Sequence, residues 1–89
     1  MTRRTKIDIM NDMLLAIQQK GGKIKPTHMM YKANLSHKLL SKYLAEFLEK
    51  KIIREEVITD QKYFLLTDKG IDFMNQYRKM KEFKDLFDI

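Results

Sequence analysis

The side chains of this sequence that are best suited to bind a ligand are lysines without acidic neighbours. No Asp or Glu occurs between Met13 and Ala45, and the same segment holds six lysines: Lys20, Lys23, Lys25, Lys32, Lys38 and Lys42. Such a surface attracts a polyanion, because each phosphate that it neutralises releases condensed counterions. The alternative is a solvated lysine face that only improves solubility. The charge pattern alone does not choose between these two interpretations.

The excess positive charge is confined to the N-terminal half of the 89 residues. Residues 1–50 contain ten basic and four acidic residues, whereas residues 51–89 contain eight of each. The whole formal net charge of +6 therefore lies in the half that contains the acid-free segment. A polyanionic partner should contact this half of the chain.

The remaining residue types argue against catalysis and against a bound metal. Cysteine is absent and His28 and His37 are the only histidines, which excludes thiolate metal sites and disfavours a zinc site. The sequence contains no supported nucleophile–base pair, no paired carboxylates and no Gly-rich phosphate loop. We therefore expect no enzymatic activity, no metal or other cofactor and no small-molecule ligand.

Targeting signals are not evident in the sequence. The longest apolar runs, such as residues 13–17, are too short to span a bilayer. Arg3 and Arg4 are not followed by the apolar segment of a secretion signal, because Asp8 and Asp12 interrupt it. We expect a cytoplasmic protein without a membrane partner, associated with the nucleoid if its partner is DNA.

A first helix is predicted over residues 6–20. Thr5 followed by Asp8 resembles a capping box, and Gly21-Gly22 can supply the left-handed residue that ends a helix. Apolar residues recur between these ends at helical spacing: Ile7, Met10, Leu14 and Ile17. This helix should bury one face in the core.

A second, short helix should begin at Pro26, and Ser36 is a suitable N-cap for a third helix that ends near residue 51. The third helix has an apolar face made of Leu39, Leu40, Tyr43, Leu44, Phe47 and Leu48. Its other face carries His37, Lys38, Ser41, Lys42 and Ala45. Carboxylates appear only at Glu46 and Glu49. A helix that enters a groove of DNA keeps carboxylates off the approaching end, so this distribution favours nucleic-acid binding.

The sequence pattern changes from helical spacing of apolar residues to β-rich runs after the third helix. Residues 52–58 and 62–66 are rich in β-forming residues, and a turn over residues 59–61 would make them a hairpin. Thr67 should cap a final helix that continues to about residue 89. Gly70 in its first turn costs stability in a helix, which indicates that another part of the backbone packs closely there.

This order of elements is a winged helix-turn-helix. Four stretches carry the resemblance: residues 31–36 (YKANLS), 43–44 (YL), 47–53 (FLEKKII) and 63–70 (YFLLTDKG). Over about residues 5–78 the chain resembles the archaeal winged-helix family of small predicted transcriptional regulators. Within it, the chain is most similar to dimeric chromatin-associated proteins whose last helix forms an antiparallel coiled coil. The resemblance implies a mainly α fold with a small β-hairpin (α+β).

As domain organisation, we expect one winged-helix domain over residues 1–89, with its core in residues 5–66. The C-terminal helix of residues 67–89 would form the dimer interface.

In that family the third helix recognises DNA and the hairpin is the wing. Carried over to this chain, the resemblance implies DNA contacts from Thr27, His28, Ser36, His37, Lys38, Ser41, Lys42 and Lys62. Ser36 would also place the positive helix N-terminus near a phosphate. Lys38 would reach guanine edges or phosphate, and we favour phosphate for Lys42. Asp60, at the tip of the wing, would repel phosphate.

Four further residues have two interpretations each. Arg3 and Arg4 form either a basic arm that enters a minor groove or a frayed tail. Tyr31 and Tyr43 adjoin the apolar stripe of their helices, so we expect half-buried packing residues rather than side chains that stack on bases.

The final helix carries a separate pattern of aromatic and apolar residues. Phe73, Tyr77, Met80, Phe83 and Phe87 recur close to every 3.5 residues, as in a coiled coil. Ile71 and Met74 are better placed to pack on the domain's own core. Because little of the chain remains to cover the residues after Arg78, we predict a homodimer through this helix. The alternative is that the helix folds back over the first one.

The sequence therefore predicts a double-stranded DNA-binding protein, acting as a homodimeric transcriptional regulator with the third helix in the major groove. Two alternatives stay open. One is an archaeal chromatin or architectural protein with little sequence preference. The other is a winged helix used only for protein–protein contact.

Overall fold

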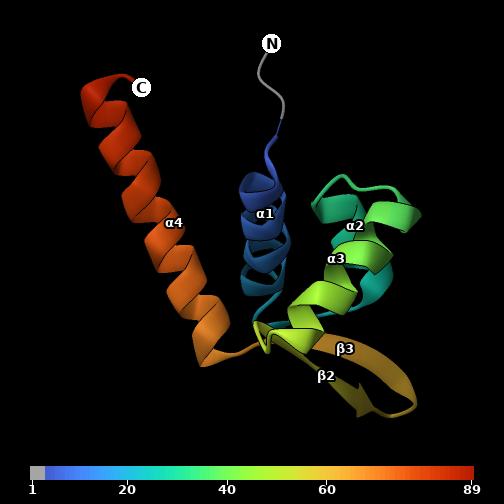
Figure 1. Ribbon diagram of the computed structural model, residues 1–89. Helices are drawn as coiled ribbons and strands as arrows, with labels where there is room; N and C mark the ends of the chain where they lie inside the picture. The colour runs from blue at the N-terminus through green and yellow to red at the C-terminus, as the bar shows by residue number, and fades with distance from the viewer. Residues whose placement is uncertain (1–3) are drawn as a thin grey trace.

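The computed structural model describes residues 4–89, which form four helices and a small antiparallel sheet in the described part of the chain. The elements are α1 (Lys6–Gln19), β1 (Lys23–Ile24), α2 (Pro26–Lys32), α3 (His37–Glu49), β2 (Ile53–Ile58), β3 (Gln61–Leu66) and α4 (Asp68–Phe87). The predicted α+β class is confirmed. Figure 1 shows α1 beside the α2–α3 pair, the β2–β3 hairpin extending from the base, and α4 running back along α1. No helix within residues 4–89 has the length and apolar character needed to cross a membrane.

Side-chain caps fix the helix starts where the sequence predicts them. The Thr5 and Asp8 side chains accept hydrogen bonds from each other's backbone N–H, which completes the capping box of α1. The Ser36 hydroxyl accepts from the backbone N–H of Leu39 at 3.2 Å, and that of Thr67 accepts from Gly70 at 3.1 Å. These caps satisfy donors that a helix leaves without partners, so each helix begins at a defined residue.

The core lies between α1, α2, α3 and the inner face of the sheet. Its largest fully buried side chains are Met13, Leu14, Ile17, Ile24, Met29, Phe47 and Ile53. They come from α1, β1, α2, α3 and β2, so each of these elements is anchored to the same cluster. Most of the apolar faces predicted for the first and third helices are buried, but Ile7 and Leu39, which were predicted to lie on them, are 44% and 37% exposed.

The sheet differs from the prediction in two respects. The strand order is β1-β3-β2, and β1 pairs with β3 through only two residues, Lys23 and Ile24. The hairpin turn contains two residues rather than three: Thr59 and Asp60 both have positive φ, 50° and 64°. This is the backbone of the tight turn that matches the twist of paired strands. Gln61 therefore belongs to β3.

Gly70 joins α4 to the rest of the domain. A side chain at this position would collide with the carbonyl oxygen of Ile52, which confirms the close backbone packing predicted there. The same carbonyl accepts a hydrogen bond of 2.8 Å from the Thr67 hydroxyl. The first turn of α4 is therefore fixed to the segment between α3 and β2.

Candidate nucleic-acid interface

The N-terminal half of α3 exposes polar and basic side chains without acidic ones, and the exposed carboxylate of Glu49 lies at the other end of the helix. His37, Lys38, Ser41 and Lys42 are all exposed, whereas Leu40, Tyr43, Leu44 and Phe47 on the same helix are buried. We call the first four residues the basic face. They occupy the first half of α3, directly after its N-cap, where the helix dipole also favours an anion.

Residues from three elements meet beside the basic face. A hollow of about 240 Å³ is lined by Thr27 of α2, His37 and Ser41 of α3, and Lys62 of β3, with apolar side chains beneath them. The structure thus brings together predicted DNA-binding residues that are separated by up to 35 positions in the sequence. His28, Ser36, Lys38 and Lys42 do not line the hollow but are exposed on or next to the same two helices.

The lysines of the acid-free segment keep their charges unpaired. Within residues 4–89, no carboxylate oxygen lies within 4.0 Å of any of the six: Lys20, Lys23, Lys25, Lys32, Lys38 and Lys42. Every ion pair found there involves a basic residue outside the segment: Arg4, Lys6, Lys50, Arg54 and Lys62. The absence of acidic residues in this segment is therefore matched by an absence of ion-pair partners for its lysines in the described residues.

Glu46, the first carboxylate of α3, lies one turn after Lys42 but is bound by lysines outside the basic face. Its Oε1 is bound by the ammonium groups of Lys6 at 2.7 Å and Lys50 at 2.9 Å. The hydrogen bond from Lys6, followed by the one from Lys50, lowers the pKa of Glu46. The negative charge of Glu46 is therefore already paired within the domain.

Lys62 is less free than the lysines of the basic face. It lies on the wing, and its ammonium pairs with Glu55 across the hairpin at 2.9 Å. An exposed pair of this kind is weak, but it places a carboxylate beside the predicted phosphate contact.

Lys23, Lys25 and Tyr63 extend the basic surface beyond the residues predicted for it. The ammonium groups of Lys23 and Lys25 lie 5.1 Å and 6.0 Å from the centre of the Tyr63 ring. Lys25 is also the N-cap of α2, and it directly precedes Pro26 and Thr27, which line the hollow. Sequence reasoning missed this group because a two-residue strand shows no periodicity. The only signal was the position of Lys25 directly before Pro26.

Arg4 has a structural role in this domain. Its guanidinium donates hydrogen bonds to the carbonyl oxygens of Ala33 and Asn34 at 2.6 and 2.8 Å, and pairs with Asp12 at 2.9 Å. Those carbonyls end α2 and lack helical partners. The side chain therefore faces the domain instead of projecting as an arm. Arg3, the other half of the predicted arm, lies outside the described residues.

The two tyrosines that were expected to be half-buried have different environments. Tyr43 is 8% exposed and packs in the core, whereas Tyr31 is 72% exposed on α2. The prediction was wrong for Tyr31, because α2 is a short helix that turns only a narrow face, centred on Met29, toward the core.

The five residues predicted for a dimer interface separate into two groups. Phe73 and Tyr77 are already half-buried within a single protomer. The Tyr77 hydroxyl donates a 2.6 Å hydrogen bond to Oδ1 of Asp8 on α1. Met80, Phe83 and Phe87 are 37%, 56% and 59% exposed, and the rings of the last two lie 4.9 Å apart. The alternative in which this helix folds back over α1 thus holds for the first half of α4 only.

The Tyr77–Asp8 hydrogen bond shifts the pKa of both groups. It is the largest cause that lowers the pKa of Asp8 to about 2, with the Thr5 backbone N–H as the next cause. The same bond raises the pKa of Tyr77 to about 12. Both shifts favour the state with the hydroxyl protonated and the carboxylate charged, so the contact holds α4 against α1 across the neutral pH range.

Four apolar side chains of α4, of which Phe73 is half-buried and the other three are exposed, fit a coiled-coil register together with the polar Gln76. Phe73, Gln76, Met80, Phe83 and Phe87 are spaced 3, 4, 3 and 4 residues apart, and we call this set the apolar seam. The predicted register included Tyr77, but its hydroxyl is bound to Asp8 on α1, so Tyr77 is not part of the seam. A small hollow of about 170 Å³, lined by Ile7 of α1 with Phe73, Gln76, Tyr77 and Met80, lies at the start of the seam.

A family model for the winged helix-turn-helix matches residues 3–85. The chain belongs to this family. Among solved structures, it is similar to Sso10a-2, a DNA-binding protein from Sulfolobus solfataricus, with a TM-score of 0.82, 20% identity and coverage of 94% of this chain and 85% of that one. At these identities the likeness establishes the fold. No curated protein sequence matches this chain significantly.

Two further winged helices are similar in structure. F93 from STIV, a winged-helix DNA-binding protein, has a TM-score of 0.75 and 20% identity, and the match covers 94% of this chain and 95% of that one. MepR, a transcription regulator of the Staphylococcus aureus multidrug efflux pump MepA, has a TM-score of 0.74 and 19% identity. That match covers 90% of this chain and 62% of MepR.

Proposed function

We propose that this winged helix-turn-helix protein binds double-stranded DNA, with α3 in the major groove and the β2–β3 hairpin as the wing, and that it regulates transcription as a homodimer. The observation that carries the proposal is the unpaired charge of the acid-free segment, which reaches the surface around the basic face. A lysine without a carboxylate nearby gains more from a phosphate than one that must first lose an existing partner.

The proposal gives the residues of this surface different roles. Lys38 lies in the first turn of α3 and reaches base edges or phosphate, whereas Lys42, one turn later, contacts phosphate. The N-terminus of α3, with Ser36, adds a site for a phosphate. Thr27 and Lys25 contact the DNA backbone from the start of α2. Arg4 receives no role in the interface because its guanidinium is bound within the domain.

The similar solved structures support a nucleic-acid partner. Sso10a-2 and F93 are both described as DNA-binding proteins, and MepR as a transcription regulator. The fold that these proteins share with this chain presents a helix after a short turn, which is the arrangement that places a recognition helix in a groove.

A second copy of the chain is the partner proposed for the apolar seam. Phe83 and Phe87 lie in the last turns of α4, beyond the residues that contact α1, and in a monomer they would face water. In an antiparallel pair, the end of one seam meets the start of the other. Phe87 of the second copy would then reach the hollow beside Ile7, Phe73 and Met80. A two-fold dimer also presents two recognition helices to two half-sites.

Reversing the charge of the basic face tests DNA binding. Lys38→Glu with Lys42→Glu should lower the affinity for duplex DNA at least a hundredfold, because two favourable phosphate contacts become repulsive. Lys79→Glu with Lys84→Glu changes the net charge equally on α4 and is the matched control. Circular dichroism checks the fold of both variants. Equal affinities of the two variants would reject the assignment of α3.

A comparison of specific and random duplexes separates a regulator from an architectural protein. A regulator should prefer a selected site over random DNA by about a thousandfold or more at physiological salt. An architectural protein should show little preference. If the chain served only protein–protein contact, neither duplex would bind at moderate salt.

A further inference from the structure

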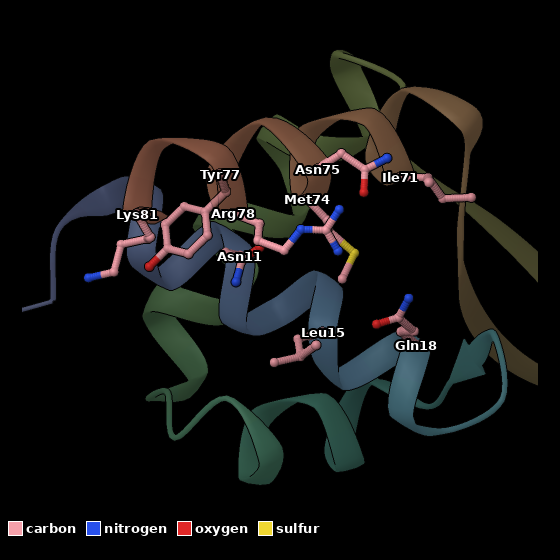
Figure 2. Close-up of a pocket in the computed structure, with 9 residues that line it drawn as sticks. All are labelled: Asn11, Leu15, Gln18, Ile71, Met74, Asn75, Tyr77, Arg78 and Lys81. Carbon is pink, nitrogen blue, oxygen red and sulfur yellow. The ribbon is translucent and has the colours of Figure 1, made fainter. Parts of the chain in front are cut away.

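The groove between α1 and α4 has the composition of a small-molecule site, although no sequence motif indicates one. It has a volume of about 300 Å³, and Tyr77 separates it from the hollow at the start of the apolar seam. Figure 2 shows its lining side chains projecting from both helices, with Asn11 and Leu15 on α1 and Met74 and Arg78 on α4. We call it the α1–α4 groove.

The lining combines an apolar floor with polar groups that have no partners. Leu15 and Met74 are half-buried and form the apolar part. Within residues 4–89, the amides of Asn11 and Asn75 make no side-chain hydrogen bond, and no carboxylate lies within 4.0 Å of Arg78.

Lys81 is the second cation of the α1–α4 groove, and it too has no carboxylate within 4.0 Å in the described residues. The charge of Lys81 contributes to the lowered pKa of Asp8, so that carboxylate lies in its neighbourhood. Asp8 is already bound by the Tyr77 hydroxyl and the Thr5 backbone N–H. No carboxylate lines the groove itself, so its net charge is positive.

We propose that the α1–α4 groove binds a small organic anion, a molecule with one carboxylate or similar group on an apolar body. The guanidinium of Arg78 presents a planar pair of donors that fits a carboxylate, and Lys81 adds a second charge. The amides of Asn11 and Asn75 supply further donors, and the apolar body packs on Leu15 and Met74. The volume is sufficient for one aromatic ring with a short acidic chain.

An occupant of this groove would fix the position of α4. One wall belongs to the core and the other to α4, so a molecule between them sets the angle between the two helices. In the proposed dimer this angle sets the separation of the two α3 helices, and the ligand would therefore change DNA affinity. This consequence rests on the proposed function, whereas binding in the groove does not.

Binding is tested with phenylacetate and its neutral analogue phenylacetamide. In titrations followed by ¹H–¹⁵N NMR, phenylacetate should shift the side-chain amide signals of Asn11 and Asn75 with a Kd on the order of 1 mM, as expected for a ligand of this size. Phenylacetamide should bind at least fivefold more weakly. Equal binding of the two, or shifts confined to residues 80–87, would overturn the proposal.

Charge-removing variants locate the site. Arg78→Gln with Lys81→Gln should weaken phenylacetate binding at least fivefold and remove the preference over phenylacetamide. Lys79→Gln with Lys84→Gln removes the same charge from exposed positions that do not line the groove. This control should bind as the wild type does, and an equal reduction in both variants would show that the ligand responds only to net charge.

The effect on DNA is measured separately. Phenylacetate at 10 mM should change the DNA affinity of the wild type at least threefold, but not that of Arg78→Gln with Lys81→Gln. Binding of phenylacetate with unchanged DNA affinity would overturn the coupling. A wild type that binds phenylacetate but no DNA, with or without the ligand, would instead reject the proposed function.

Discussion

Within residues 4–89, the basic face of α3 and the last turns of α4 both lack partners, but of opposite physical kinds. On α3, the ammonium groups of Lys38 and Lys42 have no counterion within 4.0 Å in residues 4–89. On α4, the rings of Phe83 and Phe87 contact each other and remain more than half exposed. Unpaired charge is satisfied by a polyanion and bare apolar surface by another apolar surface. We infer that one small domain presents two separate surfaces, one for DNA and one for a second copy.

The two halves of α4 show the same contrast within one helix. At its base, Gly70 fits against the carbonyl of Ile52, and Tyr77 is bound to Asp8 of α1. Beyond Met80, every residue of the helix is exposed. The helix is therefore held by the domain over its first half and available to a partner over its second half. The following predictions test each side of these comparisons.

Removing the two rings at the end of α4 should have the largest effect. Phe83→Ala with Phe87→Ala should convert a dimer into a monomer, because each ring contributes about 3–5 kcal/mol when fully packed. DNA affinity should fall at least tenfold although no residue that touches DNA changes, since each protomer then binds alone. Leu86→Ala, at an exposed position outside the apolar seam, is the control and should stay dimeric. Sedimentation of the wild type as a monomer at tens of micromolar would contradict the assignment.

A side chain at the base of α4 should destabilise the domain. Gly70→Ala places a methyl group against the Ile52 carbonyl, and overpacking of this kind costs about 1–3 kcal/mol. Urea unfolding measures this destabilisation, with Lys79→Ala as a helix control that should be nearly neutral. An unchanged midpoint would mean that the first turn of α4 is not fixed to the segment before β2.

The Tyr77–Asp8 hydrogen bond should contribute to folding rather than to dimerisation. Tyr77→Phe should cost about 1 kcal/mol at pH 7, a value reduced for solvent exposure, without changing the sedimentation of the protein. Because folding lowers the pKa of Asp8 from 3.8 to about 2, this contribution is fully present above pH 4 and is lost as the pH falls toward 2. Urea unfolding of both proteins at pH 7 and pH 2 measures it.

The stability contributed by this hydrogen bond should be lost at both low and high pH. The wild type and Tyr77→Phe should converge in stability near pH 2. Folding also raises the pKa of Tyr77 to about 12, so the same hydrogen bond should break in the wild type as the pH rises from 10 through 12. If Tyr77→Phe instead weakened the dimer and left the stability of the monomer unchanged, Tyr77 would belong to the dimer interface, as the sequence predicted.

The smallest effect is expected at the wing. Lys62→Gln should lower DNA affinity about threefold and Lys42→Gln about tenfold, because only Lys62 has a carboxylate partner to separate from. Fluorescence anisotropy at low salt resolves this difference. Equal reductions in affinity would mean that the Lys62–Glu55 pair does not compete with phosphate.

Local signals in the sequence predicted most of the fold. The caps at Thr5, Ser36 and Thr67 fixed three helix starts, and the hairpin followed from two β-rich runs. These signals work because capping and alternation are local physics, contained within a few residues. The strand β1 was missed because only its pairing with β3, some forty residues away, makes it a strand.

The candidate sites were predictable to different degrees. The exposed positions of the basic face followed from helical spacing alone. Tyr77 was placed in the wrong register because spacing cannot show that a carboxylate 69 positions earlier would bind its hydroxyl. Lys25 beside Tyr63 and the α1–α4 groove are likewise products of tertiary packing. Sequence periodicity assigns a residue to a face of its helix, but only the fold shows what lies opposite.

The salt dependence of DNA binding tests the central claim most directly. On a double-logarithmic plot of affinity against salt concentration, replacing Lys38 and Lys42 by Gln should reduce the slope by about 1.8, or roughly 0.9 for each phosphate that is no longer neutralised. Lys79→Gln with Lys84→Gln should leave the slope of the wild type unchanged. A wild-type affinity that does not depend on salt, or a slope that Lys38 and Lys42 do not affect, would contradict DNA binding through the basic face of α3.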